Sequence, residues 1–201
     1  LDLIQYQSST STFFCFNTST EPGNNKDLRL AIAHAINVDE VIEAAVNGYA
    51  TRADHFWGPD TYGYDSSIQP YEYNLDLAKQ YMEKAGYPNG GVSIKVLVNG
   101  SERMTALQVI QSQLKEIGVD IIIEEVDSAG ISAATTFASP THEAMLYFTS
   151  WNYEGDDCRR MFYTNSNVNK AHYVNQEVID LVDKAITLSD DAESCLLYTS
   201  P

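Results

Sequence analysis

Residues 150–157 combine aromatic and acidic side chains in a way that suits the binding of a cation. They read SWNYEGDD and directly follow the apolar run that begins AMLYFT. The candidate binding residues are two aromatic side chains and three carboxylates: Trp151, Tyr153, Glu154, Asp156 and Asp157. An indole or phenol face attracts a cation, and a carboxylate holds an ammonium group through a charge-assisted hydrogen bond. Taken alone, however, the stretch is better explained as a core tryptophan followed by a solvated acidic turn.

Catalysis is a competing interpretation of the same carboxylates, with Glu154 and Asp156 acting as a hydrolytic pair. The sequence offers no second acidic cluster flanked by aromatic residues that would stack on a sugar. It also lacks the nucleophile elbow, the phosphate-binding loop and the dinucleotide fingerprint. Its four histidines and three cysteines show no metal-ligand spacing. We therefore expect a binding protein with no catalytic residues, no metal and no cofactor.

The charge and cysteine content narrow the class of protein further. The formal net charge is −16, and the 12 basic residues are scattered along the chain, which argues against a nucleic-acid partner. No apolar run approaches the roughly 20 residues that a membrane helix needs. Cys15 and Cys158 could form a disulfide in an exported protein, but their wide separation favours free thiols.

The elements that must position the aromatic and acidic stretch form a mixed α/β pattern. Alternating or continuous apolar residues predict strands at 12–19, 92–99, 119–126 and 142–151. The second and third of these strands flank a helix at about 104–117, so we expect them to be parallel neighbours. The strand at 142–151 is apolar enough to be central. Ligands of open α/β sheets bind beyond the carboxyl ends of strands, where residues 151–157 would lie.

Helix caps and one long loop complete the pattern. Asn37, Asn74 and Asn175 each precede a helical apolar stripe and are expected to cap it, with Glu40 at the capping-box position after Asn37. Residues 49–73 show no helical or strand periodicity but hold seven aromatic side chains. A loop of this length either lines a functional site or attaches itself to the body of the domain through its aromatic residues, and the sequence does not decide between the two.

Five segments in order resemble one known family. They begin with FNTSTEPGNNKDLRLAIAHAINVDEVIEAAVNGYAT and GYDSSIQPYEYNLDLAKQYMEKAGYPNG. They continue with VIQSQLKEIGVDIIIEEVD, YFTSWNYEGDD and MFYTNSNVNKAHYVNQEVIDLVDKA. Together they resemble the C-terminal lobe of the family 5 solute-binding proteins of peptide-type ABC importers, over residues 12–193. The second segment is the most specific of the five.

This resemblance implies an α/β fold with a mixed sheet flanked by helices. It would be one lobe of a two-lobed periplasmic-binding-protein-like fold (type II, cluster C). Residues 1–193 would form most of the C-terminal ligand-binding lobe, without the N-terminal lobe. The implied protein is an extracytoplasmic monomer, periplasmic or lipid-anchored, that closes on a short peptide or similar amine-bearing solute and delivers it to membrane permease subunits. A sensor built on the same lobe is the alternative.

The resemblance also assigns roles within the aromatic and acidic stretch. It places Trp151 in the wall of the ligand pocket. It places Glu154 where peptide-binding members use an acid, usually Asp, to pair with the α-ammonium group of the ligand. Because the stretch YEGDD departs from the usual Asp-Pro, the pairing residue could instead be Asp156 or Asp157.

Residues 194–201 do not continue the pattern that precedes them. The peptide CLLYTSP, which ends the chain, is encoded by a DNA sequence of the kind used as a transposase adapter in sequencing libraries. We therefore expect these residues to be a sequencing-adapter artefact in a metagenomic fragment, and the natural protein to continue differently after about Glu193.

Overall fold

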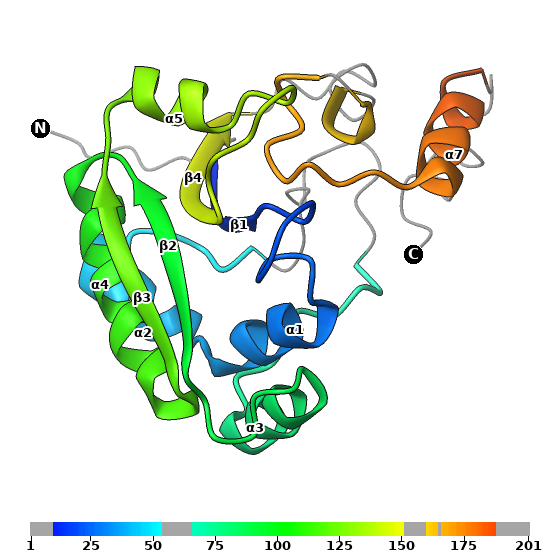
Figure 1. The fold of residues 1–201 in the computed structure, drawn as a ribbon. Helices are drawn as coiled ribbons and strands as arrows, with labels where there is room; N and C mark the ends of the chain where they lie inside the picture. Colours follow the sequence, from blue (N-terminus) through cyan, green and yellow to red (C-terminus); the bar gives the residue numbers. More distant parts are fainter. Residues whose placement is uncertain (1–9, 54–65, 151–159, 165, 188–201) are drawn as a thin grey trace, which may run out of the picture.

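The computed structural model describes residues 10–53, 66–150, 160–164 and 166–187. Three helices follow the first strand, and strands and helices then alternate along the chain (Figure 1). A short 3₁₀ turn, η1, follows α4. The elements are β1 (Thr10–Phe16), α1 (Lys26–Ala35), α2 (Val38–Val46), α3 (Leu75–Lys84), β2 (Val92–Val98), α4 (Ser101–Leu114), η1 (Lys115–Ile117), β3 (Val119–Glu125), α5 (Ser128–Ala134), β4 (Ala144–Ser150) and α7 (Gln176–Thr187). No helix in the described ranges is long and apolar enough to cross a membrane.

The four strands form one mixed sheet in the order β1-β4-β2-β3. Strand β2 is parallel to both β3 and β4, whereas β1 runs antiparallel to β4. This arrangement confirms the expected mixed α/β sheet, the parallel β2–β3 pair and the internal position of β4. The carboxyl ends of β2, β3 and β4 therefore point toward the same edge of the sheet.

The larger hydrophobic core lies on one face of the sheet, beneath helices α1, α3 and α4. Its fully buried members include Leu28 and Ile32 of α1, Leu107 of α4 and Ile94 of β2. The apolar stripe of each helix supplies these residues at helical spacing. This packing fixes the helical layer on the β2–β3 pair and leaves the carboxyl edge of the sheet to the loops.

A smaller core occupies the opposite face, where α5 covers the strands. Cys15, Met145 and Leu97 form a row across β1, β4 and β2, because Cys15 pairs with Met145 and Met145 pairs with Leu97. Ile131 of α5 packs on this row. Farther along the same face Lys95 is exposed and forms an ion pair with Glu124 over 3.4 Å, so α5 covers the face only near the carboxyl end of β2.

The first strand differs from its expected bounds, and Asn17 explains where it ends. The strand spans Thr10–Phe16 instead of residues 12–19. The side-chain oxygen of Asn17 accepts hydrogen bonds from the amide and hydroxyl of Ser19, at 3.0 and 2.6 Å. This local turn competes with the strand ladder and stops it.

All three expected asparagine caps are present, but the capping box is completed from elsewhere. Asn37 accepts a hydrogen bond from the amide of Glu40 over 3.5 Å. The Glu40 carboxylate does not return the bond to the amide of Asn37. Instead, the side-chain oxygen of Gln113, in α4, accepts a hydrogen bond from the amide of Asn37 over 3.2 Å. The side-chain nitrogen of Gln113 donates to the Glu40 carboxylate over 2.9 Å. The start of α2 is therefore tied to α4 as well as to itself.

The described ends of the long loop attach to α1. His34 stacks on Tyr81 of α3 and meets Tyr71 edge to face, with ring centroids 5.7 and 5.5 Å apart. Its Nδ1 lies 2.8 Å from the carbonyl oxygen of Glu72, and Arg52 donates to the carbonyl of Tyr71. These contacts attach the described end of the loop to the body of the domain. Residues 54–65, in the middle of the loop, lie outside the described ranges.

Candidate functional site

The candidate site begins where β4 ends. Residues 151–159 lie outside the described part of the chain, and they include every predicted binding residue. Ser150, the last residue of β4, is at the shared carboxyl edge of the three parallel strands. The structure therefore places the strand that carries these residues, while the roles of Trp151, Tyr153, Glu154, Asp156 and Asp157 stay predictions.

Strand β4 extends well past its parallel neighbour before it reaches the candidate site. Its last pair with β2 joins Leu146 to Val98. Beyond that point, its only partner among the described residues is β1, from Phe13 opposite Tyr147 to Thr10 opposite Ser150. Phe13 and Tyr147 also meet edge to face, with ring centroids 6.1 Å apart. The candidate site is thus carried on a two-stranded ribbon.

The chain that follows the candidate site returns to the same ribbon. We call residues 166–173 the return segment. Both the amide and the hydroxyl of Thr18 donate to the carbonyl of Ala171, at 2.8 and 3.0 Å. Because Thr18 closely follows β1, the stretch that contains residues 151–159 is anchored through β1 on its incoming side and just beyond β1 on its outgoing side.

A buried polar cluster joins the return segment to the entrance of β4. His142 is at its centre: its Nδ1 lies 3.1 Å from the carbonyl oxygen of Ala134, and its Nε2 lies 3.0 Å from that of Lys170. The backbone carbonyl of His142 accepts a hydrogen bond from Asn17 Nδ2 over 2.9 Å. Lys170 Nζ donates to the hydroxyl of Thr135 over 2.8 Å. The cluster thus links four separate segments of the chain.

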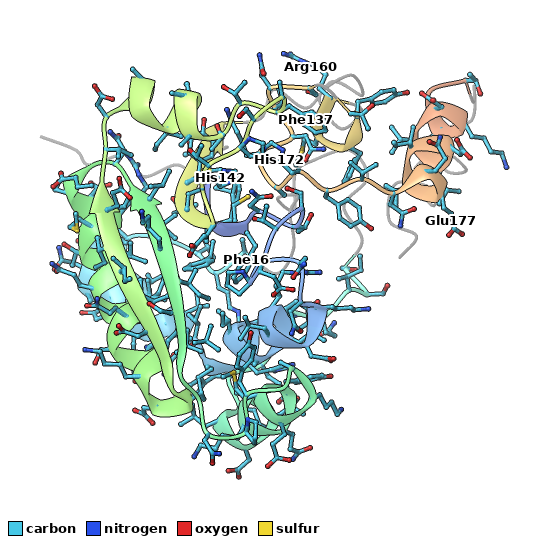
Figure 2. All side chains as sticks on the ribbon, viewed as in Figure 1. Phe16, Phe137, His142, Arg160, His172 and Glu177 are labelled. Atoms are coloured by element: carbon cyan, nitrogen blue, oxygen red, sulfur yellow. The ribbon has the colours of Figure 1, made fainter. Side chains whose placement is uncertain are left out.

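His172 completes this cluster from the return segment. Its backbone is in the left-handed region, with φ of 50°. Its ring stacks on Phe137 and lies 5.4 Å from the ring of His142, centroid to centroid. The three rings gather between α5 and the return segment (Figure 2). The Nε2 atom of His172 is buried, and in the described part of the chain it has no hydrogen-bond partner.

Burial controls the ionisation of this cluster. It lowers the pKa of His142, although the carbonyls of Ala134 and Lys170 act in the opposite direction. Burial likewise lowers the pKa of His172, and the neighbouring His142 and Lys170 lower it further. The pKa of Lys170 is lowered by burial as well. Both imidazoles are therefore neutral at pH 7.

Cys15 lies on the sheet side of this region and is not a reactive group. Burial raises the pKa of its thiol to about 12, against the opposing effect of the Lys170 charge. The thiol is free, as the sequence led us to expect, whereas Cys158 lies outside the described residues. A neutral buried thiol is neither a nucleophile nor a metal ligand, and the described residues contain no group of side chains that could hold a metal ion.

The sequence gave no signal for the buried cluster. His142 and His172 are thirty positions apart and match no motif, and they meet only because the return segment folds back onto β1. Their proximity is a product of tertiary structure alone.

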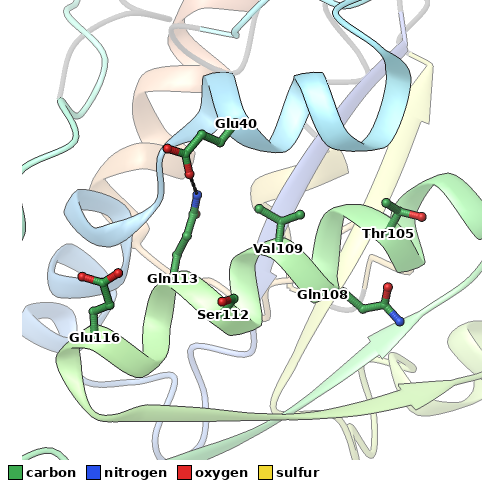
Figure 3. A pocket seen from close by; sticks show the side chains of 7 residues that line it. All are labelled: Glu40, Thr105, Gln108, Val109, Ser112, Gln113 and Glu116. Atoms are coloured by element: carbon green, nitrogen blue, oxygen red, sulfur yellow. Dashed lines mark hydrogen bonds between the residues drawn. The ribbon is translucent and has the colours of Figure 1, made fainter.

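A separate shallow hollow lies between α2 and α4 (Figure 3). Its lining is mostly polar, with Val109 between Gln113 and Thr105 along α4 and Glu40 opposite on α2. The hydrogen bond from Gln113 to Glu40 spans it. The hollow is formed by the helical layer, and none of the predicted binding residues lines it.

Comparison with known proteins places this arrangement among solute receptors. Residues 1–172 match the family model described as bacterial extracellular solute-binding proteins, family 5 Middle. The glutathione-binding protein GsiB of Escherichia coli K12 is 28% identical over 209 residues, covering 98% of this chain and 40% of that protein. GsiB of Escherichia coli O6:K15:H31 is 29% identical over the same shares. The chain thus spans about 40% of the length of these curated relatives.

Solved structures share the fold. The periplasmic binding protein DppA of Helicobacter pylori, in complex with the peptide STSA, has a TM-score of 0.86 and 29% identity, over 96% of this chain and 39% of that one. The oligopeptide-binding protein AppA of Bacillus subtilis, in complex with a nonapeptide, has a TM-score of 0.84 and 21% identity, over 96% of this chain and 42% of that one. These likenesses confirm the expected type of fold.

Proposed function

The chain belongs to the bacterial extracellular solute-binding proteins of family 5, and from this premise we propose that the complete protein captures short peptides for import by an ABC transporter. The observation that carries the proposal is the likeness, over 96% of the chain, to a receptor solved with a bound peptide at 29% identity. The name of the glutathione-binding relatives supports the same class of solute, since glutathione is itself a small peptide with a free ammonium group.

We propose that this chain supplies one side of the ligand cleft. Residues 1–193 would be most of the C-terminal lobe, which agrees with the 40% share of the relatives that the chain spans. The mixed sheet is the scaffold, and the β1–β4 ribbon carries residues 151–157 to its edge. A second lobe would supply the opposite wall, and hinged closure would enclose the peptide.

Within this cleft, the proposed role of Glu154 is to pair with the α-ammonium group of the peptide. Trp151 and Tyr153 would form flat walls beside it, where a cation gains roughly 0.5–2 kcal/mol against an aromatic face. Asp156 and Asp157 are the alternative partners of the ammonium group. Support for a pairing carboxylate comes from the position of the stretch directly after the carboxyl end of β4.

The proposed protein acts without catalysis, outside the cytoplasm and as a monomer, and it passes its ligand to permease subunits in the membrane. Its matched relatives are binding proteins by name. A binding role requires no activated nucleophile, and the one cysteine that the structure describes is a neutral, buried thiol. The acidic surface of the chain provides no basis for a nucleic-acid partner.

The complete protein provides the test. Calorimetry with glutathione, a dipeptide and a tetrapeptide should show one bound peptide per protein, and chromatography of the mixture should return the peptide intact. Product formation without retained ligand would show that the protein is a hydrolase and not a transport receptor. Neighbouring genes for two permeases and their ATPases would separate an importer from a sensor. The 201-residue chain alone should bind these peptides at least tenfold more weakly, because half of the contacts would be missing.

A further inference from the structure

The buried histidine cluster contains three basic groups and, among the described residues, no acid that faces them. His142 contacts His172 and the carbonyl of Lys170, and the Lys170 ammonium group lies 2.8 Å from Thr135 Oγ1. Among the described residues, the one other titratable group that acts on the cluster is Cys15, from β1, which is neutral at physiological pH because burial raises the pKa of its thiol to about 12. A proton added to this cluster therefore meets no compensating negative charge from the described elements.

The lack of a hydrogen-bond acceptor at Nε2 of His172 makes protonation of this ring unfavourable. The backbone of Thr135 is near its ring and favours the protonated form. Its Nε2, however, is buried with no acceptor in the described structure. An imidazolium donates from both nitrogens, so protonation would leave one buried N–H unsatisfied next to two other basic groups. Leaving a buried donor unpaired is costly, and more so when it carries charge.

The same groups hold the return segment in place. Four of its contacts matter here: His142 Nε2 with the Lys170 carbonyl, Lys170 Nζ with Thr135, Thr18 with Ala171, and the Phe137–His172 stack at 5.1 Å. Three of the four involve a basic side chain of the cluster. Any change of charge in the cluster therefore acts directly on the attachment of the return segment.

We propose that His142, His172 and Lys170 form an acid-sensitive latch, which fastens the return segment to residues 134–137 at the end of α5 and to the entrance of β4 at neutral pH and releases it when the imidazoles take up protons. This proposal is independent of the ligand and of the transport role. It concerns the anchoring of the chain that follows residues 151–159, so acid would loosen one of the two attachments of that stretch.

The pH range follows from the direction of the shifts. A histidine in the unfolded chain has a pKa of about 6.5, and burial lowers the pKa of both latch histidines below that value. The open form therefore binds more protons than the closed form as the pH falls below about 6.5. The latch is fully stable above this pH and weakens steadily below it, until the pH reaches the lowered pKa of the closed form.

Hydrogen exchange on the 201-residue chain tests the latch. Exchange is followed at pH 7.5 and 5.5, and each rate is divided by its intrinsic rate at that pH. We expect peptides covering residues 134–142 and 166–173 to lose protection by about tenfold or more at pH 5.5, which corresponds to one pKa unit of preferential protonation. Peptides from β2 should be unchanged.

Matched variants identify the groups responsible. The double variant His142→Gln/His172→Asn removes both titrating rings, and asparagine tolerates the left-handed backbone at position 172. It should show no difference between the two pH values. His34→Gln removes another buried histidine, outside the latch, and should retain the full difference. A wild-type segment equally protected at both pH values, or a pH effect that survives in the double variant, would overturn the proposal.

A second measurement covers the case in which the double variant does not fold. Histidine ring signals of the wild-type chain are followed by NMR from pH 8 to 4.5 and assigned with the single variants. The latch requires His142 and His172 to titrate below 6.5, together with broadening or shifting of amide signals from residues 166–173. Titration of both rings at or above 6.5 would contradict it.

Discussion

Gly90 and Gly118 lie in backbone contact where the turn before β2 passes the turn before β3. A Cβ atom added to Gly118 would be 2.5 Å from the Cα of Gly90, and one added to Gly90 would be 2.6 Å from the Cα of Gly118. The amide of Gly91 donates to the carbonyl of Gly118 over 2.8 Å. Parallel strands β2 and β3 begin level with each other because these two turns touch.

This contact makes Gly118 one of the least replaceable residues of the fold. Gly118→Ala introduces a clash with backbone and a side chain at φ of +75°, so we expect the free energy of unfolding to fall by about 2–4 kcal/mol. Urea denaturation of the chain provides the measurement. Gly91→Ala is the control: its φ is +88°, but nothing lies within 4 Å of the added atom. It should cost only about 1 kcal/mol, and equal losses in the two variants would refute the role of the contact.

Asn17 should be intolerant of substitution although it is neither apolar nor a ligand residue. It is fully buried, and its amide group bonds the carbonyl of His142 and the backbone and hydroxyl of Ser19. Asn17→Ala leaves these groups unpaired and should lower the free energy of unfolding by about 2–3 kcal/mol. Thermal denaturation of this variant beside Ser19→Ala tests the point, since the latter loses only the hydroxyl bond. A smaller effect at Asn17 than at Ser19 would contradict it.

Cys15 should resist alkylation in the folded chain. Because burial raises the pKa of its thiol to about 12, the thiolate fraction at pH 8 is roughly a thousandfold below that of a free cysteine of pKa near 8.5. Iodoacetamide labelling followed by peptide mass spectrometry should find it unmodified until urea is added. The same mass spectra report the labelling of Cys158 and Cys195 separately. Rapid labelling of Cys15 without denaturant would show that the smaller core is open to solvent.

The proposed ligand pairing is tested by Glu154→Gln in the complete protein. Removing one partner of a desolvated ion pair costs about 2–5 kcal/mol, so peptide affinity measured by calorimetry should fall by more than tenfold. Asp156→Asn and Asp157→Asn are the matched variants and should change the affinity by less than threefold. If one of them causes the large loss while Glu154→Gln does not, the pairing carboxylate moves to that residue.

The sequence predicted the framework of the fold because its signals are local. Asn37, Asn74 and Asn175 cap the helices that follow them, and the apolar run of β4 occupies an internal strand, as expected. The end of β1 was wrong by three residues, since the apolar pattern does not show that the Asn17 side chain turns back on Ser19. The partner of the Asn37 amide was also missed, because Gln113 is brought to it only by the packing of α4.

The candidate binding stretch and the buried histidine cluster also differ in whether the sequence points to them. Residues 151–157 became candidates through their chemistry and a family resemblance, both of which can be read along the chain, and their role stays a prediction. The sequence did not reveal the cluster of His142, Lys170 and His172, whose members come together through the return of the chain across β1. No local pattern encodes a meeting of that kind.

The projection of β4 beyond β2 gives the proposed binding stretch a particular mechanical setting. From Tyr147 onward the strand has one neighbour in the described structure, β1, whereas residues 144–146 pair with both β1 and β2. Beyond Leu146, the described structure therefore supports β4 from one side, up to the pair of Ser150 with Thr10. The end of β4 thus depends on a strand that lies far from it in the sequence, and a substitution at Thr10 acts directly on the edge that leads to the proposed binding stretch.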